Sequence, residues 1–163
     1  MITINQAEYA DIPVIKSILT DTVMWLDEIG EPMWTAEQIQ WEYLSKTFTV
    51  SDFYIAYLDG VPAGCAALVD YVDYWVDITK GESLIINKLA VKRFAKGKGV
   101  SDAIISYAKT MCTDIGVSTL RLGCPQERLK LRALYERNGF ICVAEKVTYG
   151  KYPTAFYECK IAK

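Results

Sequence analysis

Residues 83–101 read SLIINKLAVKRFAKGKGVS, and this stretch decides the fold. Its first half, Ser83–Val91, is mostly apolar and predicts a buried strand. Glycines follow at 97 and 99 among lysines, and a helical pattern begins near Ser101. Glycines allow close approach of a ligand to the backbone, and helix-start N–H groups with nearby lysines favour an anion such as phosphate. The stretch therefore predicts a strand, an anion-binding turn and a helix, with a purely connecting turn as the equal alternative.

Two nucleotide-binding motifs are absent from this stretch. Neither Gly-x-x-x-x-Gly-Lys-Ser/Thr nor Gly-x-Gly-x-x-Gly occurs in it. The turn is therefore neither a P-loop nor a dinucleotide-binding fingerprint.

The N-terminal side predicts helices followed by a hairpin. Asp11 before Ile12-Pro13 indicates a helix start, and Gly30 ends that helix. Thr35 to Gln38 has the form of a capping box and predicts a second, short helix. The apolar runs Phe53–Leu58 and Val61–Val69 are joined by Asp59-Gly60, which is a strong hairpin signal.

The C-terminal side predicts a strand at 120–124, a helix at 127–138 and two strands at 140–147 and 154–161. The expected order is β-α-α-β-β-β-α-β-α-β-β. A parallel strand pair with a crossover helix is expected in the middle, and antiparallel pairs elsewhere. We therefore expect an α/β fold with a mixed, twisted sheet of six or seven strands and about four helices on both faces. Without a repeat or linker, residues 1–163 form one expected domain.

Bulk properties exclude several functional classes. The net charge of −2 gives no electrostatic footprint for nucleic acid. Apolar runs are too short for a membrane-spanning helix, and the N-terminus lacks signal-peptide features, so a cytoplasmic location is expected. The absence of histidine excludes Ser-His-Asp chemistry and most zinc sites, and no metal is expected. Five cysteines without a Cys-x-x-Cys motif indicate reduced, buried thiols.

A second motif, LYERNGF at 134–140, follows about 40 residues after the glycine turn. Taken alone, it predicts core residues and a glycine helix cap. Together, the two motifs resemble the GNAT acetyltransferase superfamily. That family's signature reads Gln/Arg-x-x-Gly-x-Gly/Ala at a strand-to-helix turn, and a later helix carries Leu-Tyr-Glu-Arg/Lys-x-Gly-Phe. The segments NKLAV at 87–91 and LRLGC at 120–124 are similar to a bacterial branch of this family.

The resemblance implies that the chain binds acetyl-CoA. The strand end at Leu89–Val91 would pair with the pantetheine arm, and the N–H groups of the turn would hold the pyrophosphate. The implied cofactor-binding residues are Leu89, Ala90, Val91, Lys96, Gly97, Lys98, Gly99, Val100, Ser101 and Arg128.

The resemblance also implies the chemistry. An acceptor amine would attack the acetyl carbonyl directly, and a strand N–H near Leu89 would polarise that carbonyl. Tyr135 would donate a proton to the departing thiolate as a general acid. The implied function is transfer of acetyl from acetyl-CoA to a primary amine of a small molecule or peptide. A homodimer is expected by analogy with the family.

The sequence departs from the family pattern at Phe94, Asn87 and Gly123, where Gln or Arg, His and an acidic residue are usual. The last two remove the usual candidates for a general base. Other candidate bases are Asp70, Asp73, Asp77, Glu82, Glu28 and Glu31, although each is more simply interpreted as a solvated carboxylate. Nearby aromatics that could bind a cationic amine are Trp25, Trp34, Tyr71, Tyr74 and Trp75.

Three interpretations follow from these residues. The first is an active N-acetyltransferase. The second is a CoA-binding module of the same fold that has lost its chemistry, which the departures at Phe94, Asn87 and Gly123 favour. The third is an interaction protein without a small ligand. The cysteines are interpreted as core residues. Cys124 is the one to test, because it lies at a strand end near the expected thioester.

Overall fold

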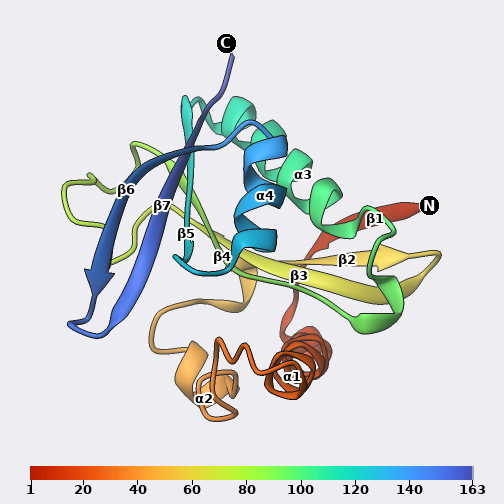
Figure 1. Ribbon diagram of the computed structural model, residues 1–163. Helices are drawn as coiled ribbons and strands as arrows, with labels where there is room; N and C mark the ends of the chain where they lie inside the picture. The colour runs from red at the N-terminus through yellow and green to blue at the C-terminus, as the bar shows by residue number, and fades with distance from the viewer. Residues whose placement is uncertain (163) are drawn as a thin grey trace. The chain divides into compact units, whose positions relative to one another are not determined.

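The helices and strands follow the order expected from the sequence (Figure 1). The structure is a computed structural model that describes residues 1–162, so Lys163 of the expected domain 1–163 lies outside the described residues. The elements are β1 Ile2–Gln6, η1 Tyr9–Asp11, α1 Ile12–Glu28, α2 Trp41–Leu44, η2 Val50–Asp52, β2 Phe53–Leu58, β3 Val61–Val69, β4 Leu84–Val91, η3 Arg93–Ala95, α3 Val100–Ile115, β5 Thr119–Pro125, α4 Leu129–Arg137, β6 Ile141–Thr148 and β7 Tyr152–Lys160.

The strands form a mixed sheet in the order β1-β2-β3-β4-β5-β7-β6. The expected parallel pair is confirmed: Leu84–Ile86 of β4 lie opposite Leu120–Leu122 of β5, and α3 connects the two strands. The outer pairs β1–β2, β2–β3, β5–β7 and β6–β7 are antiparallel. This is the α/β architecture that the sequence predicts.

By their contacts, the residues divide into two compact units. The first unit contains Met1–Ala67 and Lys88–Ile104. Its β2–β3 hairpin turns at Asp59 and Gly60, which both have positive φ (51° and 83°), as a two-residue turn of this type requires. The core of this unit includes the buried face of α1, and Phe53 of β2 packs edge-on against Phe48 with ring centroids 5.6 Å apart.

Among the described residues, the second unit contains Leu68–Asn87 and residues 105–162. Successive β7 residues point to opposite faces of the sheet, so Tyr157 faces α4 while Phe156 faces the segment between β3 and β4. The buried Tyr157 hydroxyl accepts a hydrogen bond from Arg132 Nε (2.8 Å) and donates one to Glu136 (2.6 Å), both on α4. On the other face, Trp75 packs edge-on against Phe156 at 4.8 Å. Figure 1 shows α4 running beside β5 and β7.

The prediction of a helix starting at Thr35 is wrong. The reciprocal capping hydrogen bonds form, from Gln38 N–H to Thr35 Oγ1 and from Thr35 N–H to Gln38 Oε1. They close a turn, because Gln40 adopts an extended conformation (φ −74°, ψ 147°), and α2 begins only at Trp41. A local side-chain motif thus formed without the helix that usually follows it.

The lengths of the helices and the state of the cysteines complete the description of the fold. Within residues 1–162, no helix combines the length and the apolar character needed to cross a membrane. All five cysteines are free thiols, and four of them are buried.

Candidate active site

The strand β4 is kinked at Lys88. This residue has φ of 54°, which is rare for a non-glycine residue and costs on the order of 1–2 kcal/mol. In the parallel ladder, Leu84–Ile86 of β4 pair with Leu120–Leu122 of β5, whereas β4 itself continues to Val91 and β5 to Pro125. A kink of this kind changes the direction of the N–H and C=O groups that follow it. Nothing in the sequence marked this position, because it carries no glycine.

The predicted glycine turn is present in the first unit and leads from η3 into α3. Gly97 and Gly99 have φ of 76° and 84°, and a Cβ on either would meet no atom within 4 Å. Backbone conformation, not crowding, therefore requires glycine there, and the outer side of the turn is open. The N–H groups of Lys96 and Lys98 donate to the carbonyls of Arg93 and Ala95 (3.2 Å each). The first helical hydrogen bond runs from Ala103 N–H to the Gly99 carbonyl, so the N–H groups of the first turn of α3 point out of the helix end.

Helix α1 holds this turn through polar contacts. Arg93 donates from its backbone N–H to Asp21 (2.8 Å) and from its guanidinium to Glu28 (2.8 Å). Lys96 Nζ lies 3.7 Å from the centre of the Trp25 ring. Glu28, a candidate base, is therefore engaged in an ion pair.

The structure also clarifies the signature around this turn. Phe94 is an exposed residue of η3. Counted back from Gly99, which immediately precedes α3, the first position of Gln/Arg-x-x-Gly is Lys96, a cation.

Lys88 itself is a second feature that the sequence analysis missed. Its side chain is half-buried, and its Nζ lies 4.9 Å from the centre of the Trp34 ring. Desolvation by burial lowers the pKa of Lys88 to about 8 from its ordinary value of 10.5. A kinked backbone and a poorly solvated amine thus coincide at one residue.

Tyr135, the predicted general acid, is a buried residue of α4 in the second unit. Its ring contacts those of Phe140 and Tyr157 at 5.9 Å and 6.1 Å. Burial raises the pKa of Tyr135, and the Arg128 charge at the start of α4 partly opposes this effect. The phenol therefore stays protonated near neutral pH, as a proton donor must.

Cys124 is buried on β5, and desolvation raises the pKa of its thiol to about 11. A thiol is nucleophilic only as the thiolate, so Cys124 is unreactive near neutral pH. This agrees with its interpretation as a core residue.

Asn87 and Gly123, two departures from the family pattern, meet at one tyrosine. The Tyr74 hydroxyl donates a hydrogen bond to Asn87 Oδ1 (3.2 Å). A Cβ on Gly123 would lie 3.3 Å from Cε2 of the same tyrosine ring. Burial raises the pKa of Tyr74, so its hydroxyl remains a donor. Within the described part of the chain, the buried Asn87 Nδ2 has no hydrogen-bond partner.

Several of the proposed acidic bases are occupied by cations or hydrogen bonds. Asp70 pairs with Lys80 at 2.7 Å, and Glu82 pairs with Arg121 at 3.1 Å. A hydrogen bond from the Thr79 N–H, followed by Arg121, lowers the pKa of Glu82. Asp73 accepts a hydrogen bond from the Tyr149 hydroxyl. Together with Glu28, four of the six candidate bases therefore interact with other side chains.

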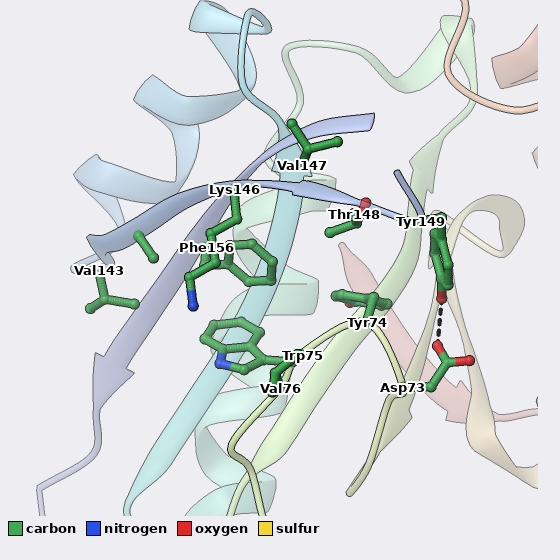
Figure 2. A pocket seen from close by; sticks show the side chains of 11 residues that line it. Asp73, Tyr74, Trp75, Val76, Val143, Lys146, Val147, Thr148, Tyr149 and Phe156 are labelled. Atoms are coloured by element: carbon green, nitrogen blue, oxygen red, sulfur yellow. Dashed lines mark hydrogen bonds between the residues drawn. The ribbon is translucent and has the colours of Figure 1, made fainter. Parts of the chain in front are cut away.

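A pocket of about 200 Å³ lies beside Tyr74 in the second unit (Figure 2). Its walls come from the segment 73–76 and from β6 and β7, and they are largely aromatic and aliphatic. In Figure 2, Trp75 and Phe156 lie on one side of Tyr74, and the Asp73–Tyr149 hydrogen bond lies on the other. No group of three or more His, Cys, Asp or Glu side chains suited to a metal ion occurs among residues 1–162.

The chain is similar in fold to several solved acetyltransferases. A GNAT-family acetyltransferase from Listeria monocytogenes superposes with a TM-score of 0.75 at 21% identity, covering 98% of this chain and 94% of that one. The ribosomal-protein-S18-alanine N-acetyltransferase from Escherichia coli gives 0.73 at 18% identity, covering 100% and 96%.

A longer protein also contains this fold. N-acetylglutamate synthase from Neisseria gonorrhoeae, in complex with coenzyme A and N-acetyl-glutamate, gives a TM-score of 0.70 at 21% identity. The match covers 100% of this chain but only 36% of that one.

Sequence comparison gives the family. No curated protein matches the chain. The family model described as "Acetyltransferase (GNAT) family" matches residues 19–140, which include both the glycine turn and Tyr135. The chain therefore belongs to the acetyltransferase (GNAT) family.

Proposed function

We propose that this protein is an N-acetyltransferase that moves an acetyl group from acetyl-CoA to a primary amine of a small molecule or peptide. The observation that carries the proposal is the passage from the kinked strand end at Lys88 through the open glycine turn to the start of α3. Such a passage suits a ligand that combines an amide-bearing arm with a pyrophosphate. The family and the neighbour that binds coenzyme A support it.

For acetyl-CoA, we assign the pantetheine amides to Leu89, Ala90 and Val91, which lie on β4 beyond its paired residues Leu84–Ile86. We assign the pyrophosphate to the turn Lys96–Ser101, through its N–H groups other than those of Lys96 and Lys98, which donate to Arg93 and Ala95, and with lysine charge in support. Arg128 is assigned to the cofactor as a further cation.

The proposed reaction is direct acyl transfer. The amine nitrogen attacks the acetyl carbonyl, a C–N bond forms, and the C–S bond of the thioester breaks. The Tyr135 phenol gives its proton to the departing thiolate, and the amine releases a proton to solvent. The Leu89 N–H, next to the kink, polarises the carbonyl oxygen. The cytoplasmic location, the single domain 1–163 and the homodimer belong to the same proposal.

Steady-state release of CoA, measured with a panel of primary amines, tests the proposal. Turnover that depends on an amine supports it. Saturable CoA binding without turnover on any amine would instead support a binding module that has lost its chemistry.

Acetyl-CoA should also stabilise the folded protein. A ligand at 100 times its Kd adds about 2.7 kcal/mol, which raises Tm by roughly 5–10 °C for a chain of this size. The Gly99→Val variant, whose side chain would enter the open side of the turn and strain a positive φ, should show a much smaller shift. An equal shift in both proteins would remove the turn from the cofactor site.

A further inference from the structure

Lys88 combines two unfavourable features. Its backbone lies in the left-handed region, with φ of 54°, and its charged side chain is half-buried. The pKa of Lys88 is lowered by desolvation, so the surroundings disfavour its ammonium form. Residues with a strained backbone or a poorly solvated charge are concentrated at functional sites. The proposed reaction gives the Lys88 amine no role, so the function of this side chain is open.

The Lys88 ammonium has no carboxylate partner. Among residues 1–162, no Asp or Glu forms an ion pair with its Nζ, and desolvation is the one cause of its pKa shift. By contrast, the half-buried Arg121 pairs with both Glu82 (3.1 Å) and Glu158 (2.8 Å). Charges that are taken out of water are usually paired. An anionic ligand would supply the counter-ion that Lys88 lacks.

Trp34 fixes the position of this ammonium. Lys88 Nζ lies 4.9 Å from the centre of the Trp34 ring, and both residues belong to the first unit. The face of an aromatic ring attracts a cation without neutralising its charge. Lys88 also retains part of its surface in solvent, so a ligand can approach its side chain. The ammonium is therefore held in place while its charge stays available.

The place of Lys88 in β4 brings this charge close to the proposed reaction centre. Lys88 directly precedes Leu89, whose N–H we assign to the acetyl carbonyl. An anion paired with Nζ is therefore separated from that N–H by little more than the length of one lysine side chain. The Lys88 carbonyl accepts a hydrogen bond from the Cys65 thiol of β3 (3.8 Å), which anchors the kink. A small acceptor can thus present its amine to the acetyl group while a negative group a few bonds away contacts Lys88.

We infer that Lys88 binds a carboxylate of the acceptor, so that the acceptor is a primary amine that also carries a carboxylate, as an amino acid does. Trp34 acts as a positioning residue that holds the ammonium. A carboxylate carries the single charge that one ammonium balances, whereas a phosphate group carries about −1.5 to −2 near pH 7. The inference rests on the proposed function and names the substrate class of the amine.

The experiment compares kcat/KM for L-amino acids, each paired with its own carboxamide. The two members of a pair have the same side chain, and only one carries a carboxylate. The carboxamide also makes the amine less basic, which favours reaction of the amide and so works against the expected result. On the wild type, the acids that are used should exceed their amides about tenfold or more, the usual value of a hydrogen bond to a charged group.

A second pair locates the carboxylate within the acceptor. L-aspartic acid α-amide carries its carboxylate on the side chain, like the N-terminal residue of an acidic peptide, and L-asparagine amide is its neutral counterpart. A tenfold preference within this pair supports the inference and assigns the carboxylate to a side chain. A preference confined to the free amino acids supports it and assigns the α-carboxylate.

Variants separate recognition of the charge from folding. Lys88→Met should lower the acid-to-amide ratio of kcat/KM about tenfold, through a higher KM for the acid. Its stability should not fall, because burial already disfavours the ammonium. Lys88→Arg keeps the charge and should retain part of the ratio, and Trp34→Leu should lower the ratio about threefold, the value of one cation–π contact. Lys46→Met is the matched control: Lys46 is exposed, lies over the Tyr43 ring at 5.4 Å, and should leave the ratio unchanged when replaced.

The acid-to-amide ratio decides the inference. A ratio near one for every pair on the wild type overturns it and leaves the acetyltransferase intact. An unchanged ratio in Lys88→Met overturns it too, because a purely structural role lowers both activities equally. Turnover of no acid and no amide counts against the proposed function. Calorimetric titration of the same acids in the presence of CoA then decides the inference: binding that Lys88→Met abolishes supports it, and no binding to the wild type overturns it.

Discussion

At the scale of single residues, Lys88 has both a strained backbone conformation and a side-chain amine with a lowered pKa. Its pKa of about 8 in the folded protein lies below the ordinary lysine value of 10.5, which applies to the unfolded chain. Between these two pH values, Lys88 therefore binds more protons in the unfolded chain than in the folded protein. Stability should therefore rise with pH across that window, and the full cost of burying the charge is present below pH 8. Lys88→Met should raise the free energy of unfolding at pH 7, because it removes a charge that is costly to bury. We expect a gain of roughly 2 kcal/mol, which is less than the full pKa shift corresponds to, since the amine is only half-buried.

Urea denaturation of wild type and variant at pH 7 and pH 10 measures this difference, which should shrink at the higher pH. Lys46→Met is the matched control, since Lys46 is exposed although its Nζ also lies over an aromatic ring (5.4 Å from the centre of Tyr43). A gain that is the same at both pH values would mean that packing, not charge burial, is responsible.

Tyr135 should affect chemistry more than binding or folding. Tyr135→Phe keeps the ring contacts with Phe140 and Tyr157 and removes only the hydroxyl. We expect kcat to fall about 100-fold, within the usual range for loss of a general acid, with little change in the KM for acetyl-CoA. Since burial raises the pKa of Tyr135, the wild-type rate should not fall with an alkaline limb at the ordinary tyrosine value near 10. Unchanged kcat in the variant removes Tyr135 from this role.

At the scale of secondary-structure elements, Gly64 allows β3 to lie close to its neighbours in the first unit. A Cβ there would approach Val100 Cγ1 to 2.8 Å and the Ala90 carbonyl oxygen to 2.9 Å. The carbonyl belongs to the β4 backbone and cannot rotate away, so Gly64→Ala should destabilise the protein by about 1–3 kcal/mol.

Chemical denaturation measures this loss as a lower midpoint with an unchanged slope. Gly60→Ala is not an equivalent control, because its φ of 83° adds backbone strain. Ala63→Gly, at the neighbouring buried position, controls for loss of packing. If Gly64→Ala is as stable as the wild type, the close approach does not contribute as described.

At the scale of the whole molecule, the two compact units are not successive stretches of chain. The chain passes between them within β3, within β4 and within α3. Neither unit can therefore complete its strands and helix without the other, and we expect one cooperative unfolding transition. Far-ultraviolet circular dichroism and tryptophan fluorescence should give coincident midpoints in urea. Two separate transitions would contradict the single domain expected from the sequence.

Much of the fold follows from local sequence. The Asp59-Gly60 turn, the glycine turn at 97–99 and the Gly139 helix end lie where the pattern places them, since each depends on the conformational freedom of glycine. The Thr35 capping box failed as a helix signal, because the extended backbone at Gln40 decides where α2 begins. The residue at which a helix begins depends on the conformation of residues that lie outside such a four-residue motif.

By itself, the sequence determined the order of elements, the anion-suited turn and the family resemblance, because these depend on short-range periodicity and on residue types at fixed spacing. Only the tertiary structure decided what lies around Asn87. Tyr74 and Gly123 are 13 and 36 residues away from it in the chain. In the structure, Tyr74 is hydrogen-bonded to Asn87, and Gly123 lies so close to the Tyr74 ring that a Cβ would crowd it. The kink at Lys88 is likewise a tertiary result, since surrounding contacts hold a lysine in a conformation that its own preferences disfavour.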